Sequence, residues 1–450
     1  MFNKHIFNLK LKFSFINYKV FIMKFLLSLV LIVFVVSSTF AENILTDNWK
    51  LKGHAFLVPY LDGRDFLNET HPITFTAMKL RVGIEKQIGN FSFKMALQNS
   101  KIFGDQAAAV SKNAPVYILE GYLKFDSILN MPLSLTAGRQ QIEYNDGRFL
   151  GLSPWNYIER SHDGFKFSYQ KNNMLLDFFA VNHTTQFVNP PFNAVPAAYP
   201  YPEAAYEGYD ILGFWYANKL GDAKNAGGAH SFDLFTYYEI DAKKTDGTNN
   251  NLDRFTSGFA YQWNANKFTA KAQMGYQHGK KAAKDVAAYL VNIYAAYKLN
   301  ENTNLKLGTE LFSGTAPTDA ATKINTFDDY LGRKHAYLGF MDYFTNIRSA
   351  YAGLGVNDFY LAADYKINSN WALNLTPHYF LSNQESASGK SDYGIEFDLG
   401  VKYTMQKGIW IEWFNGLFLP GELMKEFYTV SGKERGDMGF VSYFRFNATF

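Results

Sequence analysis

Three arginines are clustered in one short part of the sequence. Arg139, Arg148 and Arg160 lie within 22 residues, although the whole chain contains only ten arginines. A guanidinium group binds a carboxylate through two parallel hydrogen bonds, which a lysine ammonium group does not do. The cluster therefore has the chemistry needed to bind anionic groups, either on a solute or on the protein itself.

Other charged residues could act with this cluster. Lys79 and Arg81 alternate with apolar neighbours, which on a β-strand places both on one polar face. The same alternation selects Lys166, Arg254 and Arg445, and the nearby acids are Glu120, Glu143, Asp146 and Asp163. Two interpretations are open. The arginines could form an electropositive lining that concentrates anions, or they could pair with these acids and hold loops in place.

Catalytic and metal-binding patterns are weak. Ser161, His162 and Asp163 are adjacent, and adjacent residues on a strand point to opposite faces, so they cannot form a catalytic relay. The histidines lack metalloprotease spacing, and the absence of cysteine removes disulfides and thiolate chemistry. Asp328 and Asp329 remain a minor candidate for a divalent cation. We expect no enzyme activity, no cofactor and no metal.

The N-terminal segment has the layout of a secretory signal. Residues 25–36 are apolar apart from one serine, and they follow Met23-Lys24 and precede small residues up to Ala41. This run is too short for the ~20 residues of a spanning helix. We predict a start at Met23, cleavage after Ala41 and a mature domain over 42–450. Residues 1–41 carry five lysines and no acid, so the mature net charge is about −2, and we expect no nucleic-acid binding.

The rest of the chain consists of segments in which apolar and polar residues alternate, the period of a half-buried strand. There are eighteen of them, near 49–60, 73–86, 91–103, 115–125, 132–143, 163–171, 174–183, 207–220, 231–242, 252–264, 267–278, 286–299, 303–314, 350–367, 370–383, 393–405, 409–420 and 439–450. An even number suits a single-chain bacterial barrel, and the 18% aromatic content suits aromatic girdles. We therefore predict an all-β, antiparallel transmembrane barrel, wide enough to enclose a water-filled channel.

The connections between these segments alternate in length. Short polar turns occur at 87–90, 170–173, 264–266, 300–302, 368–370 and 406–408, and long connections at 61–72, 104–114, 144–162, 184–206, 315–349 and 421–438. Periplasmic turns and long external loops are sorted in this way in outer-membrane barrels. The last segment ends on Phe450 with alternating aromatics. We expect outer-membrane lipid, lipopolysaccharide and, through this terminal strand, the barrel-assembly machinery as partners.

One stretch resembles a known family. Residues 135–151 read LTAGRQQIEYNDGRFLG, followed by Trp155-Asn156, Arg160 and Asp163-Gly164. The Gly-Arg-Gln strand end, the Asp-Gly-Arg loop, the tryptophan and the later Asp-Gly resemble the alginate-export family of outer-membrane barrels, as does Leu119-Glu120-Gly121-Tyr122-Leu123. The close match covers about 50 residues. The resemblance implies an eighteen-stranded barrel in the outer membrane of a Gram-negative bacterium, with an electropositive constriction that passes a polyuronate.

The chain also departs from the alginate exporter of that family. The exporter has a long periplasmic gating loop near its C-terminal strands, whereas the turn here, 406–408, has three residues. We therefore expect an open channel that passes anionic or saccharide solutes by passive diffusion. The alternative is a general or differently selective porin for small solutes. An outer-membrane hydrolase is the least favoured reading. Residues 187–206 contain five prolines and are expected to cap or narrow the pore.

Overall fold

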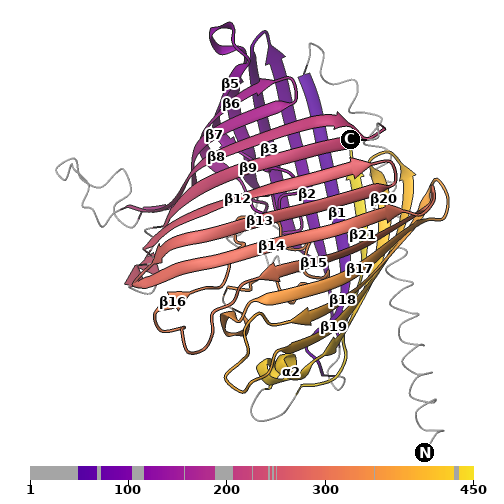
Figure 1. The fold of residues 1–450 in the computed structure, drawn as a ribbon. Helices are drawn as coiled ribbons and strands as arrows, with labels where there is room; N and C mark the ends of the chain where they lie inside the picture. Colours follow the sequence, from indigo (N-terminus) through magenta and orange to yellow (C-terminus); the bar gives the residue numbers. More distant parts are fainter. Residues whose placement is uncertain are drawn as a thin grey trace, which may run out of the picture.

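Eighteen long strands form the wall of a barrel in the computed structural model (Figure 1). The structure describes residues 49–67, 72–103, 116–156, 158–187, 206–224, 227–241, 244–245, 248–249, 251–348, 350–429 and 435–450, so the predicted signal segment lies outside the described residues. The wall strands are β1 (Trp49–Gly63), β2 (Ile73–Ile88), β3 (Phe91–Ile102), β4 (Val116–Phe125), β5 (Leu133–Gln140), β6 (His162–Lys171), β7 (Met174–Phe187), β8 (Tyr206–Asp222), β9 (Gly228–Asp241), β12 (Leu252–Ala265), β13 (Phe268–Lys281), β14 (Lys284–Lys298), β15 (Thr303–Phe312), β17 (Val356–Lys366), β18 (Trp371–Leu381), β19 (Asp392–Gln406), β20 (Ile409–Pro420) and β21 (Gly439–Thr449).

The sheet closes because its first and last strands pair. β1 runs antiparallel to β21, and the Gly53 N–H donates to the Phe450 carbonyl at 2.8 Å. Each wall strand is antiparallel to both of its neighbours, and the short β16 (Lys323–Ile324) adds to β14 in parallel. Closure leaves the wall without an unpaired edge, which a sheet in a bilayer requires. The predicted all-β barrel of eighteen strands is confirmed.

Side chains alternate between the inside and the outside of the wall. On β14, Val286, Ala288 and Leu290 are buried inside the barrel, whereas Tyr289 and Ile293 are exposed on its outer face. The outer face is rich in exposed apolar and aromatic side chains, which is what a lipid-facing surface requires. In the described part of the chain, no helix is long and apolar enough to cross a membrane.

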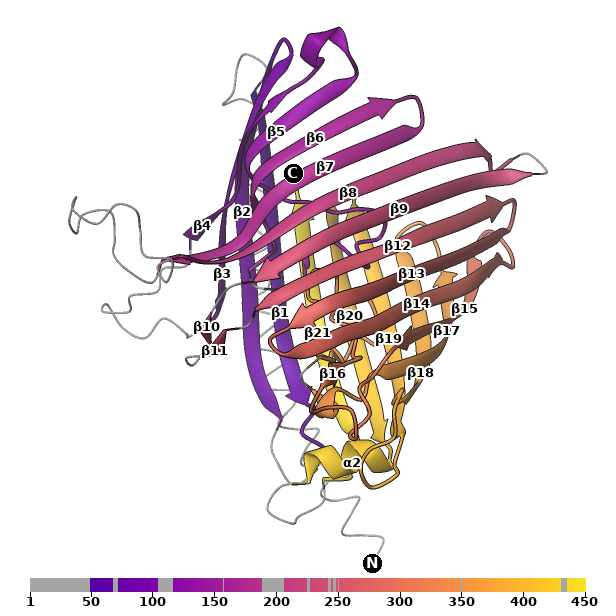
Figure 2. The same cartoon turned by 60° about the vertical axis from the view of Figure 1, so that its left-hand side comes forward.

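Short turns gather at one end of the barrel and most longer connections at the other (Figure 2). The exception is the two-residue link 282–283, which joins β13 to β14 at the long-loop end. That end also carries the hairpin of β10 (Lys244–Thr245) and β11 (Thr248–Asn249) and the helix α2 (Glu422–Tyr428). The stretches 104–115 and 188–205 lie outside the described residues, and with them nearly all of the proline-rich segment that we expected to cap or narrow the pore.

Two connections fold into the barrel. Residues 141–161 join β5 to β6, and residues 313–355 join β15 to β17; we call them the first and second inner loops. They account for the strand limits that the sequence placed wrongly, because the segment expected to reach 143 ends at Gln140 and the one expected to begin at 350 begins at Val356. Both loops had been expected on the outside.

Aromatic packing holds the inner loops against the wall. Phe149 of the first loop packs on Phe235 of β9, with ring centroids 4.7 Å apart. Phe344 of the second loop packs on Phe380 of β18 at 4.5 Å. All four rings are at most 4% exposed, so the core of this protein lies between the loops and the inner wall.

Gly275 makes room for the first inner loop. A Cβ added at Gly275 of β13 would lie 2.3 Å from the Phe149 ring. We expect Gly275→Ala to displace this ring and to lower the free energy of unfolding by about 1–3 kcal/mol, the usual cost of overpacking. Denaturant unfolding in detergent measures the change. Gly400→Ala is the matched control, because the nearest atom to its Cβ would be 3.8 Å away; equal losses in the two variants would contradict the prediction.

Candidate functional site

Arg148 joins both inner loops to the inner face of the barrel wall. Its guanidinium is fully buried, pairs with Glu310 of β15 at 2.9 Å and lies 3.7 Å from Asp329 of the second loop. The rings of Phe312 and Tyr337 lie over it at 4.7 and 4.3 Å. Burial opposes the charge of Arg148, but Glu310 and Asp329 raise the pKa of its guanidinium. One side chain thus joins the first loop, the second loop and the wall.

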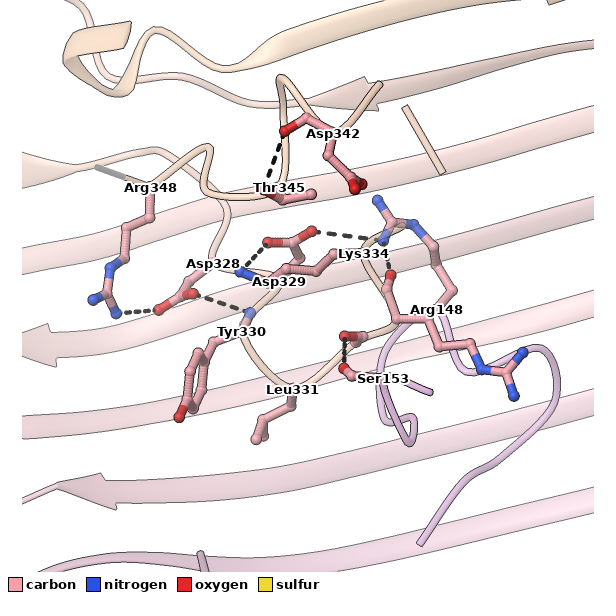
Figure 3. A network of polar contacts seen from close by, with 12 residues as sticks. Arg148, Ser153, Asp328, Asp329, Tyr330, Leu331, Lys334, Asp342, Thr345 and Arg348 are labelled. Carbon is pink, nitrogen blue, oxygen red and sulfur yellow. Dashed lines mark hydrogen bonds and ion pairs between the residues drawn. The ribbon is translucent and has the colours of Figure 1, made fainter. Parts of the chain in front are cut away.

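A second ionic group surrounds Asp328 of the second inner loop. Arg254 of β12 donates to Asp328 at 3.1 Å. Arg348 of the second inner loop donates to the same carboxylate at 2.6 Å (Figure 3). Arg254 also binds Glu239 of β9 through two hydrogen bonds, at 2.7 and 2.9 Å. Burial raises the pKa of the Asp328 carboxyl, but Arg254 and Arg348 outweigh it and lower that pKa below its ordinary value.

These contacts leave little room for the divalent cation considered at Asp328 and Asp329. Asp328 is bound by two arginines, and Asp329 lies 3.6 Å from the Lys334 ammonium and near Arg148. Within the described residues, no group of three or more histidine, aspartate or glutamate side chains is arranged to hold a metal ion.

The charged residues of β2 hold the first inner loop. Lys79 donates to Glu159 at 2.9 Å, and Arg81 pairs with the same carboxylate at 2.6 Å. Arg160 lies beside Glu159 in the chain and is buried, and its guanidinium donates to backbone carbonyls of both inner loops, among them Leu331 at 2.6 Å. All three cations therefore contribute to the attachment of the loops.

The remaining inward-facing candidates are also paired. Lys94 binds Glu120 at 2.6 Å, and Lys166 lies 3.7 Å from Asp177 of β7. Arg445 pairs with Glu412 of β20, and its guanidinium lies over the rings of Trp155 and Trp410. Trp155 in turn stacks on His335, with ring centroids 3.7 Å apart, which makes it a packed member of the loop interface.

Arg139 and Asp163 do not lie inside the barrel. Their neighbours Gln140 and His162 are buried, whereas Phe165, which has the parity of Asp163, is 55% exposed on the outer face. Arg139 and Asp163 form a 2.7 Å ion pair across β5 and β6 on that outer face. The sequence had placed Arg139 and Asp163 in the lumen, and the structure corrects this by placing both on the outer face.

The tripeptide around His162 forms no catalytic relay. Ser161 is buried and donates to the Leu119 carbonyl at 2.6 Å, His162 is buried, and Asp163 is exposed on the opposite face. These orientations follow from strand geometry.

The sequence did not single out the main cavity. A space of about 460 Å³ lies between the second inner loop and strands β14 to β21. Lys306 of β15 projects into it, with its ammonium 5.4 Å from the Tyr294 ring and 5.2 Å from the Tyr360 ring. Among the described residues, no carboxylate pairs with Lys306. Its alternation with Leu305 and Leu307 was the signal that could have marked it as inward-facing.

Two further cavities adjoin this space. One of about 520 Å³ near the short turns shares Asp364, Asn374, Gly400 and Glu412 with it. Another of about 250 Å³, lined by Phe56, Tyr60 and Trp155, shares Phe340 and Tyr443 with it. The shared residues place the three cavities in series along the inside of the wall.

A closed barrel with inward-folded loops and cavities along its wall defines a porin-like outer-membrane channel. The chain belongs to the alginate export family, whose family model, Alginate export, matches residues 74–436. Its place is the outer membrane of Gram-negative bacteria. No curated protein matched the sequence.

Solved structures with a similar fold include outer-membrane proteins of low sequence identity. OccAB4 of Acinetobacter baumannii has a TM-score of 0.56 and 11% identity, over 89% of this chain and 98% of that one. OpdK of Pseudomonas aeruginosa has 0.55 and 11% over the same shares. A structure of OpdK with vanillate has 0.54 and 10%, again over 89% and 98%. These likenesses concern the fold.

Proposed function

We propose that this protein is a passive channel for small anionic solutes, sugar acids and short acidic oligosaccharides among them, and that Lys306 is its main anion-selecting group. The supporting observation is the position of Lys306, whose ammonium group has no carboxylate partner in the described residues and lies in the cavity of about 460 Å³ beside the second inner loop. A cation between low-dielectric walls raises the local concentration of anions.

The arginines support this channel indirectly. Arg148, Arg160 and Arg254 are buried and hold the inner loops. Their contacts therefore do not favour a lumen lined by free arginines. Lys79 and Arg81 bind Glu159, and Arg445 binds Glu412. Lys306 is the lysine that lines the cavity of about 460 Å³, and it has no carboxylate partner in the described residues. The cavity of about 460 Å³ suits a small ligand, and vanillate, with which OpdK was crystallised, is an example of a small organic anion.

Tyrosine and phenylalanine rings complete the proposed route. Tyr294, Tyr360 and Tyr337 line the same cavity as Lys306, and Phe340 and Tyr443 lie at its junction with the next one. Flat rings stack on sugars and aromatic solutes while leaving polar edges free. No catalytic step is proposed for these residues.

Reversal potentials in planar bilayers test the proposal. We expect the wild type to prefer chloride over potassium, Lys306→Gln to lose most of this preference and Lys306→Glu to invert it, because the sign of the unpaired charge sets the local ion concentration. Arg139→Ala is the control, since Arg139 lies on the outer face and should leave selectivity unchanged.

Two outcomes would count against an anion channel. A wild-type preference for cations would exclude it, and an unselective wild type that Lys306→Gln does not alter would favour the general porin. The carboxylates of Asp364 and Glu412 in the same cavity are the observation that favours this second candidate.

A further inference from the structure

Two acidic side chains face the second inner loop from neighbouring inward positions of β19. Asp398 accepts the backbone N–H of Phe340 at 2.9 Å, and Glu396 accepts that of Met341, also at 2.9 Å. Both carboxyl groups are fully buried. Residues 338–342, which we call the latch segment, are thus attached to the wall through these two acids.

The two carboxyl groups project from positions two residues apart on the same inner face of β19, so they lie next to each other. Glu396 Oε2 and Asp398 Oδ1 are buried, and neither oxygen has a hydrogen-bond partner among the described residues. Two carboxylates in contact and out of water do not both ionise readily. Adjacent buried carboxyl groups of this kind favour a single proton shared between them.

The surrounding charges only partly compensate this pair. From β18, His378 lies 3.7 Å from Asp398 and is hydrogen-bonded at 2.9 Å to Asp358 of β17. Glu310 of β15 is paired with Arg148. β20 contributes only Phe418 and Gly416 opposite these positions.

The basic side chains of the loops also have other partners. In the second inner loop, His335 is bound to Asp342 at 2.8 Å. Arg64, in the connection after β1, pairs with Asp62 and donates to the Met341 carbonyl at 2.7 Å. Among the described residues, Glu396 has no cationic partner.

Movement of Glu396 would be transmitted to the latch segment. The backbone of Gly339 packs so closely on the Glu396 carboxyl that a Cβ at this position would lie 2.4 Å from Oε1. Gly339, Leu338 and Asp342 all have positive φ, so the segment is a tight turn that needs its attachments to persist. Leu338, Gly339 and Phe340 also line the main cavity.

We propose that Glu396 and Asp398 form a proton-dependent latch that fixes residues 338–342 to β19 and so limits the width of the channel. Loss of the shared proton at alkaline pH places two negative charges side by side. Glu396 then moves away from Asp398, displaces Gly339 and releases the turn. The latch does not depend on which solute crosses the channel. Disproof of the latch would leave the proposed selectivity at Lys306 intact, and disproof of that selectivity would leave the latch intact.

Single-channel conductance measured from about pH 6 to about pH 10 tests the latch. We expect the wild-type conductance to rise at the alkaline end of this range. Glu396→Gln should stay at its neutral-pH conductance throughout, because glutamine keeps the hydrogen bonds and cannot ionise. Asp364→Asn is the matched control, since Asp364 lines the same cavity but makes no contact with the latch segment, and it should keep the wild-type transition.

A chemical probe gives an independent readout. The chain has no cysteine, so Ala336→Cys in the second inner loop provides one thiol. At the same alkaline pH, its modification by a charged thiol reagent should be slower with Glu396→Gln than without it. The proposal is overturned if Glu396→Gln retains the wild-type transition, if the wild type shows none, or if the transition requires calcium and disappears with a chelator, which would make the pair a cation site.

Discussion

Arg148→Ala should lower the free energy of unfolding by about 3–5 kcal/mol, the usual cost of removing one partner from a buried ion pair. The substitution leaves the buried carboxylates of Glu310 and Asp329 without their guanidinium partner. It also removes the side chain that joins the two inner loops to the wall. We therefore expect higher and noisier single-channel conductance together with the loss of stability, the latter measured by denaturant unfolding in detergent.

A comparison with Arg139→Ala separates burial from charge in this prediction. Both substitutions remove one arginine and break one or more ion pairs, but the Arg139 side chain is 32% exposed and its partner Asp163 is 53% exposed. An exposed pair contributes at most about 1 kcal/mol. Losses of equal size in the two variants, or an unchanged conductance in Arg148→Ala, would show that Arg148 does not hold the inner loops.

The wall of the barrel was predictable because it depends on local alternation. Every strand repeats inward and outward residues, and closure requires only that enough such strands follow one another. Parity also placed Lys79, Arg81 and Arg254 on the inner face, where the structure has them. Their proposed contact with a solute stays a prediction.

Arg139 shows what happens when parity is not applied. It was grouped with Arg148 and Arg160 because of its position in a motif. Along β5, however, Thr136 and Gln140 are buried, and Arg139 has the opposite parity. The signal was present in the sequence.

The inner loops could not be predicted from local pattern. Arg148 pairs with Glu310, which is more than a hundred residues away in the sequence. Arg333 of the second loop pairs with Glu143 of the first at 2.7 Å. Such partners become neighbours only after the barrel has closed, and a polar connection rich in aspartate and arginine has the composition of an external loop. The cavity beside Lys306 exists because these loops fold inward, so it could not be predicted from the sequence for the same reason.

Asp328→Asn should destabilise the protein by about 3 kcal/mol at neutral pH, since it removes the charge that binds Arg254 and Arg348 in a buried site. The pKa of Asp328 is lower in the folded protein than in the unfolded chain. Its carboxylate therefore contributes stability that is fully present above the unfolded pKa of about 3.9 and is lost as the pH falls through the folded value.

The loss of this stability in acid makes the prediction specific, because asparagine resembles the protonated form of aspartic acid. The difference in unfolding free energy between wild type and Asp328→Asn should be constant from neutral pH down to about pH 5 and should shrink under more acidic conditions. Asp285→Asn is the control, as Asp285 is 73% exposed and pairs with Lys280 on the outer face. A difference that stays constant in acid would mean that Asp328 acts through shape and hydrogen bonding, and that its charge does not hold the second inner loop in the barrel.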